Sequence, residues 1–196
     1  EVNDDSATDF GAELRALRYQ IHPHFLFNTL NAISTLVLEG QAEAATSMIS
    51  RLADFFRATL ERPSVNEVSL DDELFLTKQY LEIERLRFGD RLRVEITVDP
   101  VLLSCLVPHL FLQPLVENSI RHGIAPRLGS GLVSIVARKD RDQLIIKVCD
   151  DGLGKQSRPG SKNGDSKGIG LKNIDRRLTE LYGDQGGLQL QWPQTG

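Results

Sequence analysis

The hydrophobic pattern of this chain changes near Gly89, and that change constrains the fold more than any other feature. Before Gly89 the apolar residues recur every three or four positions, as they do on one face of a helix. Beyond it, apolar and polar residues alternate as on a half-buried strand, at Leu92, Val94, Ile96 and Val98. The sequence therefore predicts a helical first part, a second part that contains strands, and a domain boundary between them.

The helical part contains two apolar segments joined by a short connection at Gly40. Two stripes of apolar side chains follow the helical period between residues 9 and 38, and residues 41–60 repeat that period. We expect these segments to form an antiparallel helical hairpin. One hairpin can bury little of its apolar surface, whereas two copies can bury both stripes in a four-helix bundle. The pattern therefore predicts a homodimer.

A third helix is predicted for residues 70–88, because Ser69 and Asp72 have the spacing of a helix N-cap and Gly89 can end the helix. The elements expected beyond it are a helix from Pro108 to His122, strands at 133–137 and 144–149, a helix at 171–181 and a strand at 188–192. This mixture predicts an α+β fold class. The domains expected are the hairpin at 1–66, a connecting helix at 67–90 and an α/β sandwich at 91–196.

Composition narrows the functional classes. The 196 residues include 23 Lys and Arg against 27 Asp and Glu, so the chain lacks the basic field that non-specific nucleic-acid binding requires. No apolar run reaches the roughly 18 to 20 residues that span a bilayer, and the start lacks a signal-peptide pattern. We expect a cytoplasmic protein that binds no nucleic acid directly. Cys105 and Cys149 are expected to be buried free thiols.

The first candidate site is the His22-Pro23-His24 segment inside the first predicted helix. A proline there removes a backbone hydrogen bond to Tyr19 and costs roughly 3 kcal/mol unless it is compensated, which favours a functional kink. The alternative is a pair of ordinary histidines beside a tolerated kink. Because residues two apart on a helix point about 200° apart, only one histidine is expected to react.

Polar residues on the helix predicted before Gly123 form a second candidate site. Within LFLQPLVENSIRHG, Glu117 precedes Asn118, which shares a helix face with Arg121 and His122. An amide oxygen can ligate Mg²⁺, and cationic side chains can contact phosphate oxygens. Taken alone, the pattern also fits a solvated helix face.

Two glycine-containing turns follow. In VCDDGLG a strand ends at Asp150, which can accept a hydrogen bond from an exocyclic amine such as that of adenine. In KGIGL the glycines open a helix whose first amides can bind phosphate. The first turn alone also fits a hairpin or a calcium-like loop, and the second is not a Rossmann fingerprint because Asn173 occupies the third glycine position. Residues 151–167, rich in Gly, Ser and Lys, are expected to form a mobile lid.

The order of these motifs resembles the N, G1 and G2 boxes of the GHKL (Bergerat) ATP-binding fold. Upstream, QIHPHFLFNTLNAI resembles the phospho-acceptor helix of the LytS/YehU-type sensor histidine kinases, and YLEIERLRFGDRL and LQPLVENSIRHG are similar to the same family. The resemblance covers about residues 14–190. It implies a homodimeric ATP-dependent histidine kinase of a two-component system that uses ATP and Mg²⁺. It also implies transfer to an aspartate of a response regulator, often one with a LytTR DNA-binding domain. A link to a membrane is expected only through a missing N-terminal sensory region.

The resemblance assigns roles to individual residues. It implies His24 as the phospho-acceptor because the match PHFLFN begins at Pro23, with Asn28 a candidate to orient the imidazole and Glu117 in the catalytic set. The residues implied for the nucleotide site are Asn118 as the Mg²⁺ ligand, Arg121 and His122 near the phosphates, Asp150 on adenine, and Gly152, Gly154, Gly168, Gly170 and Leu171 around the pocket.

Two features depart from the family pattern. His22 stands where the family usually writes Asn, and the sequence ends at WPQTG, before the glycine-rich turn and last strand expected of the nucleotide domain. Two other functions fit parts of the sequence. A dimeric scaffold could signal through helix movement without phosphorylating itself. A GHKL serine kinase of the anti-sigma type would use the second half but leave the histidine-bearing hairpin without a purpose.

Overall fold

The computed structural model describes three segments of the chain, residues 23–60, 66–152 and 169–191, and within them all side chains except those of residues 23, 24, 60 and 169. The chain divides into two compact units, residues 1–52 and residues 53–196. The domain boundaries predicted near residues 66 and 90 stay predictions.

The first unit contains the helices of the predicted hairpin. Helix α2 spans Pro23–Leu38, and helix α3 spans Ala42–Leu60 and continues into the second unit. The connection is a tight turn in which Gln41 N donates to Leu36 O at 2.8 Å. The helical period thus correctly predicted two helices and a short connection. The predicted helix start near residue 9 lies outside the described residues, as does the chain on the N-terminal side of Pro23.

Helix α4 (Leu70–Phe88) has the boundaries that its capping residues predicted. At its start, Ser69 Oγ accepts a hydrogen bond from Asp72 N and donates one to Asp72 Oδ2. At its end, Gly89 adopts a φ of 57°, a left-handed conformation that glycine tolerates. Helix α4 follows the short strand β1 (Glu67–Ser69), which pairs antiparallel with β3 (Leu106–Pro108).

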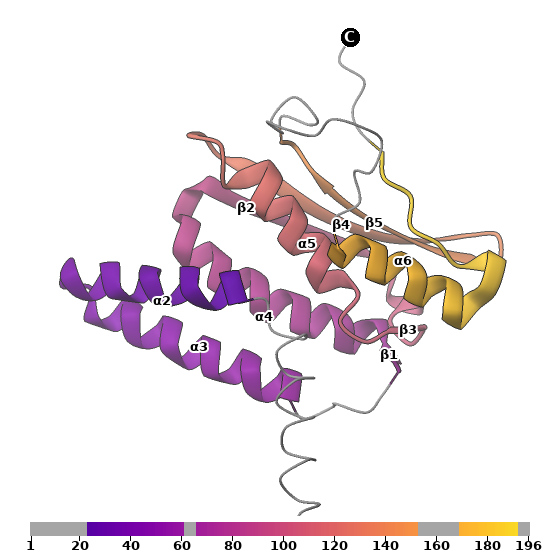
Figure 1. Cartoon of the computed structure of the whole chain (residues 1–196), viewed down its shortest axis with the longest axis horizontal. Coiled ribbons are helices and arrows are strands. Elements are labelled where there is room, and N and C mark those ends of the chain that lie inside the picture. Colours follow the sequence, from indigo (N-terminus) through magenta and orange to yellow (C-terminus); the bar gives the residue numbers. More distant parts are fainter. Residues whose placement is uncertain (1–22, 61–65, 153–168, 192–196) are drawn as a thin grey trace, which may run out of the picture. The chain divides into compact units, whose positions relative to one another are not determined.

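A three-stranded sheet forms the centre of the second unit. Strand β2 (Leu92–Val98) runs parallel to the middle strand β4 (Gly131–Asp140), and β5 (Gln143–Asp150) runs antiparallel to β4. Helices α5 (Leu112–Ser119) and α6 (Ile169–Tyr182) lie on one face of this sheet (Figure 1).

Alternation along the strands determines which side chains face the helices. On β4, Val133, Ile135 and Ala137 are buried, whereas Ser134 and Val136 between them are only half-buried. Because strand side chains alternate between faces, the first set forms the core face of the sheet. Helices and a mixed sheet packed in this way confirm the α+β fold class.

Three predictions about this unit are wrong. Pro108 ends β3 rather than opening a helix, because a loop at residues 109–111 intervenes and α5 begins only at Leu112. Residues 188–191 form no strand, since Leu188 N donates to Asp175 Oδ1 of α6 instead of joining a ladder.

The two cysteines are the third correction, because neither is buried. Cys149 is exposed, since it lies opposite Ser134 on the face of the sheet away from the core, and Cys105 is half-buried. Within the described segments no helix is both long and apolar enough to cross a membrane.

Candidate functional site

Helix α5 changes its hydrogen bonding as it approaches Gly123. Beyond Ser119 the chain forms a π-helical turn, Ile120–Ile124, in which Ala125 N donates to Ile120 O at 2.8 Å. Such turns are frequent at functional sites because they change the direction in which side chains project. Here Arg121 and His122 are exposed on the turn, while Asn118 is half-buried one turn earlier.

Asp150 lies against Gly123, a residue of this turn. Asp150 is opposite Val133 in the β4–β5 ladder, so its side chain lies on the core face of the sheet, the face that carries α5. A Cβ on Gly123 would come within 2.3 Å of Asp150 Oδ1, and a Cβ on Gly152 would come within 2.4 Å of the Gly123 Cα. Only glycine fits at both positions, and the two motifs predicted from the sequence therefore meet here.

Asp151, the next residue, has different partners. Its Oδ1 accepts hydrogen bonds from Leu132 N at 2.8 Å and from Arg127 Nη1 at 2.7 Å, and its carbonyl oxygen accepts a second bond from Arg127 Nη1. The two consecutive carboxylates thus have separate partners: Asp150 lies beside Gly123, whereas Asp151 is bonded to the start of β4 and to Arg127.

Glu117 is buried behind Asn118 and next to charges on α4. Burial raises the pKa of Glu117 to about 7; the charge of Glu84 raises it further, while Arg121 and Arg87 lower it. Burial likewise raises the pKa of Glu84 to about 7, although Arg87 Nη2 lies 2.7 Å from Glu84 Oε2. Two buried carboxyls and one arginine therefore form an acidic cluster beneath the polar face of α5.

The start of α5 is capped by a residue of another helix. Glu73, in the first turn of α4 and only 1% exposed, accepts hydrogen bonds from Leu110 N at 2.8 Å and Leu112 N at 2.9 Å. Leu110 has a φ of 59°, which is uncommon for a residue with a side chain. Glu73 thus holds a strained loop and supplies the helix cap that Phe111 lacks.

Helix α6 is attached to the same loop. Arg177 donates to His109 O at 2.5 Å and to Asn66 O at 2.7 Å, and Tyr182 OH donates to Glu67 Oε1 at 2.6 Å. In the first turn of α6, a Cβ on Gly170 would lie 3.9 Å from Pro114 Cβ of α5, and Leu171 is buried. The predicted phosphate-binding helix therefore begins beside the predicted Mg²⁺-binding helix.

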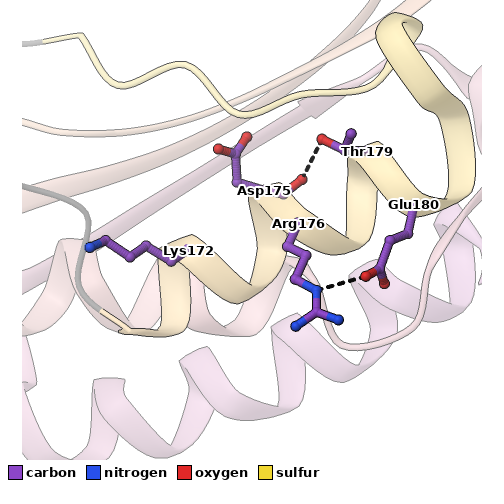
Figure 2. Close-up of a pocket in the computed structure, with 5 residues that line it drawn as sticks. All are labelled: Lys172, Asp175, Arg176, Thr179 and Glu180. Carbon is purple, nitrogen blue, oxygen red and sulfur yellow. Dashed lines mark hydrogen bonds and ion pairs between the residues drawn. The ribbon is translucent and has the colours of Figure 1, made fainter.

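An open pocket of ≈ 440 Å³ lies along α6. Figure 2 shows its lining, which comes from α6 alone: Lys172, Asp175, Arg176, Thr179 and Glu180. An exposed ion pair between Arg176 and Glu180 lies at its edge. None of the residues predicted to bind nucleotide lines this pocket.

Part of the predicted site lies outside the described residues. This holds for Gly154, Gly168 and residues 153–167 of the predicted lid, and for the side chain of His24. Asn28 lies on α2, one turn after His24. In the described segments no group of three or more His, Cys, Asp or Glu side chains could hold a metal ion.

The sequence analysis missed Glu73, Arg177 and Asp151. Two of them carried a signal, because each charged residue interrupts an apolar stripe: Glu73 lies between buried Leu70 and Leu74, and Arg177 follows the buried positions 171 and 174. A charge at a core-facing position indicates a specific polar partner. Asp151 carried no such signal, because its role depends on the strand register.

Known proteins resemble this chain along most of its length. A family model described as histidine kinase matches residues 12–92. Sensor histidine kinase BtsS of Escherichia coli strain K12 is 38% identical over 180 residues, which cover 91% of this chain and 31% of that protein. Sensor protein LytS of Oceanobacillus iheyensis is 38% identical over 190 residues, covering 92% of this chain and 32% of that protein.

A third relative and one solved structure complete the comparisons. Sensor histidine kinase YesM of Bacillus subtilis is 34% identical over 178 residues, covering 91% of this chain and 30% of that protein. The chain thus spans about a third of the length of these curated relatives. Among solved structures, the histidine kinase domain from Erythrobacter litoralis EL346 blue-light activated histidine kinase aligns with a TM-score of 0.46 and 18% identity, covering 89% of this chain and 85% of that one.

Proposed function

We infer that the chain belongs to the LytS-type sensor histidine kinases, and we propose that it phosphorylates its own His24 with ATP and passes the phosphoryl group to a response regulator. The neutral imidazole of His24 attacks the γ-phosphorus, the bond to the bridging oxygen breaks, and ADP leaves. An aspartate carboxylate of the regulator then takes the phosphoryl group from the histidine. Histidine is mostly neutral at pH 7 because its unperturbed pKa is about 6.5, so no strong base is required.

The close approach of Gly123, Asp150 and Gly152 is the observation that carries this proposal. Because Cβ atoms on Gly123 and Gly152 would collide with atoms that are already there, the two glycines let the end of β5 approach the π-helical turn closely and place the exposed Asp150 carboxylate beside that turn. Asp150 Oδ1 accepts from Gly152 N at 3.1 Å, and among the described residues Oδ2 has no hydrogen-bond donor. A carboxylate oxygen presented in this way fits the exocyclic amine of adenine.

The remaining nucleotide-site roles follow along α5 and α6, in a domain that we assign to the GHKL fold. Asn118 would hold Mg²⁺ through its amide oxygen, with phosphate oxygens and water completing the coordination, as Mg²⁺ prefers. Arg121 and His122 would contact the phosphates, supported by their exposure on the π-helical turn. Bound Mg²⁺ would neutralise the charge that develops during phosphoryl transfer. Buried Glu117 completes the catalytic set beside Asn118.

The hairpin helices support the proposed homodimer. Although Phe25 and Met48 are buried, five large apolar side chains of the first unit are more than 45% exposed: Phe27, Leu30, Val37, Leu38 and Ile49. Apolar surface of this kind on a helical hairpin is expected to pack against a second copy in a four-helix bundle. Leu30→Glu should therefore convert a dimer into a monomer in light scattering, whereas Glu43→Gln, at a polar position of α3, should leave the dimer intact.

The identity of the partner and of the sensor lies beyond this chain. The curated relatives are about three times as long, which supports an additional sensory region and, through it, a membrane link for a catalytic part in the cytoplasm. We assign a response regulator of the LytTR type as the candidate acceptor.

Autophosphorylation with γ-labelled ATP tests the proposal directly. We expect the wild type and His22→Gln to acquire an acid-labile label and His24→Gln to acquire none. A label that survives acid would favour a serine kinase. A wild type that binds nucleotide but takes no label would favour the scaffold.

A further inference from the structure

We propose that Arg127 and Asp151 form a lock that gives the site its preference for adenine over guanine, by fixing Asp150 as a hydrogen-bond acceptor. This inference rests on the proposed nucleotide site. Neither residue would touch the base, so both are positioning residues. The same lock explains why the strand ends in two carboxylates, although only one of them lies beside Gly123.

The contacts of Asp151 tie the end of β5 to two other segments. Its N–H donates to Leu132 O at 3.2 Å, and its Oδ1 accepts from Leu132 N at 2.8 Å. Asp151 thus satisfies both backbone hydrogen-bonding groups of Leu132. Arg127 Nη1 lies 2.7 Å from both the Asp151 carbonyl oxygen and Oδ1. Asp151 is therefore held by three hydrogen bonds besides its backbone pairing with Leu132.

The loop that carries Arg127 is itself held in place. Arg91 Nη2, from the turn before β2, donates to the Arg127 carbonyl oxygen. Gly131, where the loop enters β4, leaves no room for a side chain, since an added Cβ would lie 2.5 Å from Ile124 Cδ1. Movement of Arg127 would therefore disturb packing at both ends of its loop.

Fixing Asp150 matters because the two purines differ at the atom that would face it. Adenine carries an amine at position 6, which donates to a carboxylate, whereas guanine carries a carbonyl oxygen, which a carboxylate repels. A site that pairs a polar group of its ligand strongly rejects an analogue that cannot make the pair. That rejection requires a carboxylate that cannot turn away. With the turn locked and Oδ1 occupied by Gly152 N, Asp150 has one orientation in which to meet the base.

Binding of ATP and GTP to the purified chain, measured by calorimetry with Mg²⁺, tests the lock without relying on kinase activity. We expect Arg127→Gln to lower the ratio of ATP to GTP affinity about tenfold, the size expected from losing one charge-assisted hydrogen-bonded pair. Arg127→Lys keeps a cation at the same place and should retain most of the ratio. Arg138→Gln, at an exposed position on the other half of β4, is the matched control and should leave the ratio unchanged.

A double variant tests whether the two residues act as one unit. If they do, Arg127→Gln combined with Asp151→Ala should lose no more discrimination than the worse single variant. Additive losses, or an unchanged ratio in both single variants, would overturn the lock. Should Arg127→Gln fail to fold by circular dichroism, Asp151→Asn carries the test, because it keeps an oxygen for Leu132 N and removes only the charge. A wild type that binds neither nucleotide would contradict the proposed function instead.

Discussion

Helix α5 begins and ends in opposite surroundings. Its start is buried, where Glu73 of α4 caps the helix and Arg177 of α6 holds the preceding loop. Its end is open, where the helix loosens into a π-helical turn, Arg121 is exposed, and Gly123 touches Asp150 through a contact that only glycine permits.

One short helix is therefore fixed at its start and accessible at its end. At the start, charged groups act on the backbone and leave no room for solvent. At the end, two glycines allow β5 to approach the helix closely, and Arg121, His122 and Asp150 are exposed. Stability should therefore depend mainly on the first end and ligand affinity mainly on the second.

Removing the cap should have the largest effect. Glu73→Ala leaves the buried N–H groups of Leu110 and Leu112 without their acceptor, so we expect the free energy of unfolding to fall by about 3 kcal/mol. Urea denaturation measures this loss. Glu82→Ala, at an exposed ion pair on the same helix, is the matched control and should cost less than about 1 kcal/mol. Equal losses in the two variants would show that the Glu73 cap contributes no more to the free energy of unfolding than an exposed ion pair does.

The buried carboxyls should also make stability depend on pH. Burial raises the pKa values of Glu73, Glu84 and Glu117 from 4.5 to about 7, so between these values the folded state holds more protons than the unfolded state. The free energy of unfolding contributed by these groups therefore falls as pH rises from about 5 to 8.

Glu84→Gln removes one of the three groups, so its loss of stability between pH 5 and 8 should be smaller than that of the wild type by about 2 kcal/mol. Denaturation curves at four pH values supply the comparison, and Glu82→Gln should follow the wild type. Curves for Glu84→Gln and wild type that stay parallel would contradict the expected coupling.

At the open end, Gly123→Ala should act on binding more than on folding. The added methyl group would overlap Asp150 Oδ1, so the carboxylate must move, and we expect ATP affinity to fall about tenfold with a stability loss near 1 kcal/mol. Gly129→Ala is the control because nothing lies within 4 Å of its added Cβ. If Gly123→Ala bound ATP as tightly as the control, Asp150 would not contact the adenine base.

The smallest effect is expected at the far end of α6. Tyr182→Phe removes one hydrogen bond, to Glu67, and should lower the free energy of unfolding by about 1 kcal/mol or less while leaving ATP affinity unchanged. Thermal melting and calorimetry together test this. A large change in ATP affinity would mean that the hydrogen bond between α6 and β1 influences the nucleotide site at the open end of α5.

Local signals allowed part of this fold to be predicted from the sequence. Helix α4 was predicted with correct ends because Ser69, Asp72 and Gly89 act within one turn of the residues they cap. Alternation likewise predicted β2, β4 and β5, but it did not reveal the short strands β1 and β3 and wrongly predicted a strand at residues 188–192. The start of α5 was misplaced at Pro108 because its cap comes from Glu73, 39 positions before Leu112. A local sequence pattern cannot predict a contact between residues so far apart in the chain.

For the candidate site, too, the residues could be predicted from local sequence but their contacts could not. Gly123 and Asp150 were each recognisable within a motif, but their contact depends on the pairing of β5 with β4. The role of Asp151 depends on the same pairing, and so does the partner of Arg127. Residue types could thus be predicted from sequence, whereas the relation between them required the sheet register.

The pair of aspartates at the end of β5 bears on how this edge strand tolerates errors in assembly. A strand displaced by one position turns every side chain to the opposite face, which ordinarily removes a binding residue from its site. Here the neighbour is chemically identical, so a displaced β5 would still direct a carboxylate toward Gly123. Such a form would lack the partner of Arg127 and would turn Lys147 toward the core face, so both penalties favour the native register.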